Sequence, residues 1–219
     1  MSKHFREPVN GFTHMGAAIA AVIGLGLLLY LSRTSLVLMT VLLIYGISLI
    51  MMFTASSIYH LVKGGPTVMQ RLRKLDHTAI YFLIAGTYTP ICFYFFDGFW
   101  RWGILATIWA LAFAGIIVKM FVINAPRWVT AGIYLVMGWL AVIGFGQIIT
   151  NMPASAITWL VLGGVFFSVG AIVYITKRPN FFPTVFGFHE IWHIFVILGC
   201  LAHFILIAFF IAPAPPPVF

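Results

Sequence analysis

Apolar residues form long, nearly uninterrupted runs along this chain, and short polar segments separate them. Seven runs reach about 20 residues, the length that an α-helix needs to cross a bilayer. They cover approximately residues 12–32, 35–61, 76–95, 101–122, 128–149, 155–176 and 187–211. The connections are short, which favours antiparallel neighbours. The pattern therefore predicts an all-α membrane protein, a seven-transmembrane helix bundle.

Composition strengthens this prediction. The chain has 219 residues, of which 63% are hydrophobic and only 7% are charged, whereas a soluble domain carries about 25% charged residues. No room remains for a separate soluble domain. We expect one transmembrane domain over residues 1–219, with a cytoplasmic N-terminal segment at 1–11 and a proline-rich tail at 212–219.

The basic residues lie in the connections, and their distribution predicts an orientation. Ten of the twelve fall on the side of the N-terminus: Lys3, Arg6, Lys63, Arg71, Arg73, Lys74, Lys119, Arg127, Lys177 and Arg178. Because cytoplasmic loops are enriched in Lys and Arg, the N-terminus is predicted to be cytoplasmic and the C-terminus outside. This places the protein in the plasma (inner) membrane as a multi-pass protein. The bilayer also explains the net charge of +8 better than a nucleic-acid partner does.

Ionisable residues are costly at membrane depth and are usually functional. His60 falls in the last turn of the second run, and Asp76 opens the third. His189 and His193 lie in the first two turns of the seventh run. With the predicted orientation, all four side chains lie at the cytoplasmic ends of their helices. Three helices far apart in sequence therefore present His, Asp and a His pair at one depth.

This arrangement predicts a metal site. His189 and His193 are four residues apart, so their side chains share one helix face. His60 would supply a third nitrogen and leave one tetrahedral position for water, as in catalytic zinc sites. Asp76 would bind the ion directly or hold that water, and Ser56, one turn before His60, could donate a hydrogen bond there. Nitrogen ligands favour zinc over calcium or magnesium, with iron or another transition metal as an alternative.

The same "HEIWH" segment also matches the zinc-protease pattern, in which Glu190 would activate water. Nothing else in the sequence resembles a peptide-binding strand or a soluble protease domain, so an intramembrane metal site is favoured. His203 shares the face of His189 but lies about 21 Å deeper. It is predicted to bridge helices by a hydrogen bond rather than to join the site.

Several segments together resemble the bacterial hemolysin-III-type membrane proteins of the progestin and adipoQ receptor (PAQR) superfamily. "EPVNGFTH" carries the family's spacing at Glu7, Asn10 and His14, and "SSIYH" carries its Ser-x-x-x-His. "LDHTAIYFLIAGTYTP" and "FHEIWHIFV" follow in the expected order. The resemblance implies seven helices, zinc held by His60, His189 and His193, and a zinc-bound water held by Asp76 with Ser56 beside it. Superfamily relatives are ceramide-cleaving enzymes or receptors, and cytolysis is reported for some hemolysin-III members.

Two functions are consistent with these patterns. The first is a zinc-dependent, ceramidase-like hydrolase that acts on a lipid amide or ester, with the fatty-acyl chain in the apolar interior. The second is a non-catalytic membrane-homeostasis or signalling protein in which zinc joins helices. The same ligands serve both, so the sequence leaves open whether the protein is an enzyme. A channel fits less well, because few carboxylates or polar residues lie at other depths.

Overall fold

The computed structural model describes residues 4–122, 124–183 and 185–215. These residues form α1 (Pro8–Leu31), α2 (Leu36–Leu61), α3 (Pro66–Phe95), α4 (Gly98–Phe121), α5 (Arg127–Gly138), the 3₁₀ helix η1 (Leu140–Gly144), α6 (Phe145–Asn151), α7 (Ala154–Thr176) and α8 (Phe188–Phe210). Seven segments are long and apolar enough to cross a membrane, with Arg127–Asn151 counted as one. The predicted seven-helix membrane fold is confirmed. Lys3 and residues 216–219 of the proline-rich tail lie outside the described residues.

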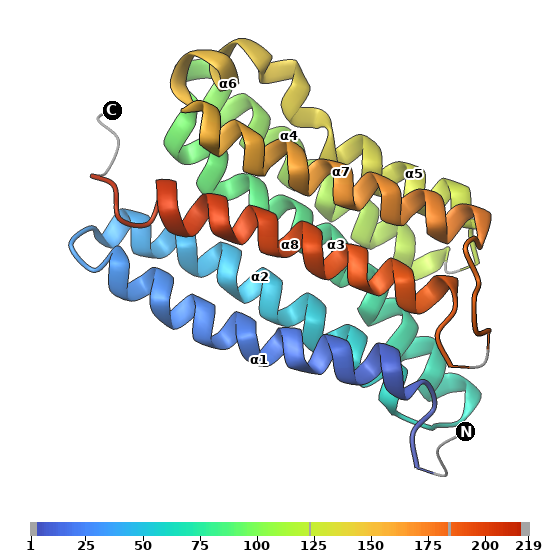
Figure 1. Cartoon of the computed structure of the whole chain (residues 1–219). Coiled ribbons are helices and arrows are strands. Elements are labelled where there is room, and N and C mark those ends of the chain that lie inside the picture. The colour runs from blue at the N-terminus through green and yellow to red at the C-terminus, as the bar shows by residue number, and fades with distance from the viewer. Residues whose placement is uncertain (1–3, 123, 184, 216–219) are drawn as a thin grey trace.

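The helices form a bundle in which the first and last spans are neighbours. α1 packs against α2 and α8, α7 packs against α8 and α5, and α5 also contacts α3. α4 packs against α3. Figure 1 shows that the start of α1 and the connections α2–α3, α4–α5 and α7–α8 lie at one end of the bundle, which we call the basic end. α8 finishes at the opposite end.

The outward surface of the bundle is apolar. Ile23, Val136 and Phe209 are each about 70% exposed, at 69%, 70% and 71%. A continuous apolar surface of this kind promotes aggregation in water and suits contact with the acyl chains of a bilayer. Buried polar side chains occur along the bundle, and one group of them gathers near the basic end: Asn10, His14, Ser56, Ser57, His60, Asp76 and His193. The interior of the bundle therefore contains a concentrated polar region at this end.

The helices α2 and α3 approach each other closely because small residues face one another. A Cβ added to Gly86 would lie 2.6 Å from the Cβ of Ser48, closer than real side chains pack. Small residues allow such backbone approach between membrane helices, where apolar burial gives no driving force. The contact fixes α3, which carries Asp76, against α2, which carries His60.

The predicted start of the third span is wrong. α3 begins at Pro66 rather than Asp76, so Asp76 lies in the third turn of the helix instead of opening it. Proline is favoured in the first turn, where no backbone N–H is needed. Residues 67–75 include Met, Gln, Leu, Arg and Lys, which favour helix but are too polar for a search based on apolar runs.

The predicted fifth span, 128–149, is confirmed as a crossing, but it is not one continuous α-helix. α5 ends at Gly138, and η1 and α6 continue the crossing. The Tyr88 hydroxyl lies 2.8 Å from the carbonyl oxygen of Gly138 and accepts a hydrogen bond from the Ala141 N–H at 2.8 Å. Backbone groups freed by a break at membrane depth need protein partners, because lipid supplies none. Tyr88 of α3 provides them.

We expect Tyr88→Phe to destabilise the folded protein by about 1–3 kcal/mol, because it leaves the Ala141 N–H and the Gly138 carbonyl without the hydroxyl. Reversible unfolding of the purified protein in detergent measures this loss. Tyr30→Phe is the matched control, because Tyr30 is 61% exposed and its hydroxyl has no such role. Equal stability of the two variants would contradict the role given to Tyr88.

Candidate metal centre

Three histidines from two helices meet at the basic end of the bundle. His60 lies in the last turn of α2, and His189 and His193 lie in the first two turns of α8. Each offers a ring nitrogen, and these three atoms all lie within 4.8 Å of one another. His60 and His193 are only 2% and 1% exposed. The sequence placed these rings at one depth, and the folded chain brings them into one cluster.

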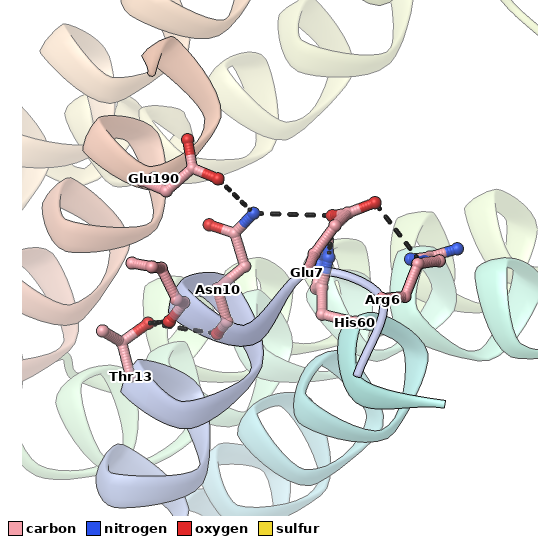
Figure 2. Close-up of polar contacts among 7 residues, drawn as sticks. Arg6, Glu7, Asn10, Thr13, His60 and Glu190 are labelled. Carbon is pink, nitrogen blue, oxygen red and sulfur yellow. Dashed lines mark hydrogen bonds and ion pairs between the residues drawn. The ribbon is translucent and has the colours of Figure 1, made fainter. Parts of the chain in front are cut away.

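Glu7, immediately before α1, fixes the orientation of His60 (Figure 2). Its Oε2 atom lies 2.5 Å from Nδ1 of His60, and its backbone N–H donates to the His60 carbonyl at 2.9 Å. A carboxylate only accepts, so Nδ1 of His60 carries the proton and Nε2 keeps a free lone pair. Burial raises the pKa of Glu7, but the hydrogen bond from His60 and the positive charge of nearby Arg6 outweigh this and lower the pKa to about 2.

Glu190 joins α8 to α1. Its Oε1 accepts a hydrogen bond from Nδ2 of Asn10 at 2.8 Å, and its Oε2 accepts one from the Gly187 N–H at 2.8 Å. Figure 2 shows Asn10 between Glu190 and Glu7. A glutamate near a helix N-terminus that accepts a backbone N–H is a capping residue. Because both oxygens have donors, the geometry favours this structural role over that of a protease base.

The cluster leaves several buried ring nitrogens without hydrogen-bond partners. The His14 ring stacks on the His193 ring, with centroids 3.9 Å apart and planes at 28°. Among the described residues, Nδ1 of His193 and both nitrogens of His14 are buried and have no partner. Unpaired buried polar atoms are costly, and each calls for an explanation. A cation held by the three clustered histidines would give one ring nitrogen of His193 a partner.

Asp76 and Ser56 lie beside this cluster. The Ser56 hydroxyl hydrogen-bonds the Asp76 carboxylate, and the two residues are 3% and 7% exposed, respectively. Asp76 and His60 both line the polar space at the basic end. However, the ligand-spaced group contains the three histidines and not Asp76. This geometry places Asp76 next to the candidate ligands rather than among them.

Two hollows meet at Asp76. An internal cavity of about 140 Å³ runs among α3, α5, α7 and α8 and is lined mainly by apolar side chains. A polar vestibule of about 990 Å³ lies at the basic end and is lined by His60 and His189. Asp76, His77, Tyr174 and Trp192 line both. The Asp76 carboxylate therefore lies at the junction between the polar vestibule and the apolar cavity.

His203 has the role that the sequence predicted. Its Nε2 lies 3.2 Å from the carbonyl oxygen of Leu160, which links α8 to α7. The ring also lines the apolar cavity. It does not belong to the histidine cluster.

Sequence reasoning missed the contacts of Glu7 and Asn10. Glu7 is one of only four acidic residues, and it precedes the first span at the same end as His60. The depth argument that grouped His60 with His189 could therefore have included Glu7. The pairing of Asn10 with Glu190 left no such signal, because two residues 180 positions apart share no pattern.

Comparison with known proteins agrees with the fold and the motifs. The sequence profile of the family described as Haemolysin-III related matches residues 2–204. The chain is 33% identical to Hemolysin-3 of Bacillus cereus over 219 residues, which covers 97% of this chain and 95% of that protein. It is 35% identical to the Hemolysin-3 homolog of Bacillus subtilis (strain 168) over 172 residues, or 78% of each chain. The human Monocyte to macrophage differentiation factor is 27% identical over 210 residues, which covers 91% of this chain and 82% of that protein. The chain thus belongs to the haemolysin-III family of multi-pass membrane proteins, within the progestin and adipoQ receptor superfamily.

Proposed function

We propose that this protein is a zinc-dependent intramembrane hydrolase that cleaves a lipid amide or ester, with its basic end facing the cytoplasm. One observation carries the proposal. Three histidine nitrogens within 4.8 Å of one another stand beside the buried Asp76–Ser56 pair, where the polar vestibule meets the apolar cavity. Such a junction suits a substrate with a polar head and an acyl chain.

The donor set suits zinc. Three imidazoles leave one position of a tetrahedral ion for water, as in catalytic sites. The carboxylate of Glu7 on Nδ1 of His60 matches the pattern in which a carboxylate orients a metal-binding histidine through its other ring nitrogen. When bound, zinc supplies Lewis-acid chemistry and lowers the pKa of water at the site to about 7.

Asp76 and Ser56 act on the reacting groups in this proposal. Asp76 orients the attacking water, takes a proton from it and delivers that proton to the leaving amine or alcohol as the carbonyl–nitrogen or carbonyl–oxygen bond breaks. Ser56 holds the Asp76 carboxylate through their hydrogen bond and can donate to the oxygen of the scissile carbonyl. The apolar cavity holds the acyl chain, and the vestibule supplies water.

We expect Asp76→Asn to reduce hydrolysis about 10²–10⁴-fold while zinc stays bound, because the amide cannot accept the proton. The assay follows fatty-acid release from a panel of lipid amides and esters by mass spectrometry, with zinc content measured on the same samples. Asp97→Asn at the opposite end of the bundle is the matched control and should retain the full rate. An unchanged rate in zinc-loaded Asp76→Asn protein would overturn the catalytic role of Asp76.

We also expect Glu7→Gln to weaken zinc binding about 10–100-fold, because it removes the carboxylate that orients the His60 ring. Competition with a chromophoric chelator measures the affinity without any turnover. Asp97→Asn is the control, since it removes a carboxylate that contacts Arg101 and Asn151 rather than the cluster. If both variants bind zinc as tightly as the original protein, the orienting role of Glu7 is wrong.

The alternative is a signalling or membrane-homeostasis protein with structural zinc. One related protein carries the name Adiponectin receptor protein, from Drosophila melanogaster, at 28% identity over 220 residues. The histidine cluster spans α2 and α8, so an ion there would also hold these helices together. The hydrolysis assay separates the two functions, because the alternative predicts that no tested lipid yields a product. Chelation would lower the unfolding temperature in either case.

A further inference from the structure

The vestibule is lined by three arginines and three carboxylates, and two of these arginines form no ion pair with the residues that the structure describes. Arg6, Arg73 and Arg127 line it, from three separate segments of the chain. Arg6 pairs with Glu7, at 3.3 Å between Nε and Oε1. Among residues 4–122, 124–183 and 185–215, no carboxylate forms an ion pair with Arg73 or Arg127. Two guanidinium groups therefore face the vestibule without an anionic partner.

The acidic side chains nearby are already engaged. Both oxygens of Glu190 accept hydrogen bonds from Asn10 and the Gly187 N–H, and Glu7 is shared between His60 and Arg6. Asp76 accepts the Ser56 hydroxyl. The carboxylates thus have partners on α1, α2 and the start of α8. The two arginines without a carboxylate partner lie on α3 and α5.

Arg127 is held in a way that suits ligand binding. Its guanidinium carbon lies 5.3 Å from the centroid of the Tyr174 ring and 5.2 Å from that of Phe188. Its Nη1 is buried and has no hydrogen-bond partner among the residues that the structure describes. Aromatic rings fix the plane of a guanidinium and leave its N–H groups free to donate. A buried donor of this kind is costly unless something binds to it.

Arg73 approaches the same place from α3. Its Nη1 donates to Oδ1 of Asn124 at 3.3 Å, which holds the side chain across to the α4–α5 connection. Arg73, Arg127 and Tyr174 all line the vestibule, and the guanidinium of Arg127 lies over the Tyr174 ring. Tyr174 in turn lines the vestibule and the apolar cavity. Arg73 and Arg127 thus lie on the vestibule side of the junction with the apolar cavity.

We propose that Arg73 and Arg127 form a binding site for the phosphate of a lipid headgroup, with the acyl chain of that lipid in the apolar cavity. Guanidinium groups bind phosphate oxygens through paired, charge-assisted hydrogen bonds, and Nη1 of Arg127 gains the acceptor that it lacks. The phosphate site is inferred from the residues that line the vestibule and requires no hydrolysis. The corollary that the hydrolysed lipid carries a phosphate rests on the proposed function.

The test measures binding to the full-length protein in nanodiscs of neutral lipid, without turnover. Three probes are titrated: phosphatidic acid, diacylglycerol with the same acyl chains, and inorganic phosphate. We expect phosphatidic acid to bind at least tenfold more tightly than diacylglycerol. Arg127→Gln and Arg73→Gln should each reduce this preference about tenfold, because each removes one charged hydrogen-bonded contact. Both should leave diacylglycerol binding unchanged.

Lys177→Gln is the matched control, because Lys177 follows α7 in the α7–α8 connection, at the basic end, and does not line the vestibule. Arg127→Lys keeps the charge but loses the paired donors, so it should lose preference as Arg127→Gln does, though by less. Unfolding temperatures of all variants establish that they are folded. If Arg127→Gln fails to fold, Arg73→Gln and Arg127→Lys decide the result.

Equal binding of phosphatidic acid and diacylglycerol would overturn the site. If Lys177→Gln loses as much of the preference as the arginine variants, the site is also overturned, because surface charge alone then explains the binding. Inorganic phosphate as tight as phosphatidic acid would overturn the lipid source in favour of a soluble anion. Absence of hydrolysis with the preference intact would overturn the proposed function and leave the headgroup site standing. The two failures are therefore distinguishable.

Discussion

Hydrocarbon offers no hydrogen-bond partner to a polar group, and this constraint organises the whole bundle. Every polar side chain and every broken turn of backbone must find its partner within the protein. At the fifth span the partner is the Tyr88 hydroxyl, which serves the backbone around Gly138. At the basic end the polar groups satisfy one another through the chain from Arg6 through Glu7 and Asn10 to Glu190. The few nitrogens that remain unpaired there are therefore informative.

The segment before α1 has more influence on the candidate metal centre than its length suggests. Glu7 holds the His60 ring by its side chain and the end of α2 by its backbone N–H. Asn10 carries the connection on to α8 through Glu190. The first turn of α1 thus joins both helices that supply the histidine cluster. A small set of hydrogen bonds sets the relative position of side chains that come from opposite halves of the sequence.

The sequence predicted the seven spans and the histidine cluster because both depend on patterns that the bilayer imposes. Apolar length identifies spans, and helix ends give depth, so His60, His189 and His193 could be grouped before any coordinates were known. The start of α3 was missed because Arg71, Arg73 and Lys74 interrupt the apolar pattern without interrupting the helix. The break after Gly138 was missed because it depends on Tyr88 from another helix. Partners of this kind are fixed by tertiary packing, which leaves no local signal.

The histidine cluster, the vestibule and the basic connections all lie at the end where α1 begins, and α8 finishes at the opposite end (Figure 1). An odd number of crossings leaves the two chain ends in different compartments. A fluorescent protein or affinity tag fused before α1 would lie at the opening of the vestibule, next to the hydrogen bonds of Glu7 and Asn10. The same fusion after α8 would lie on the other side of the bilayer and would leave the opening of the vestibule accessible.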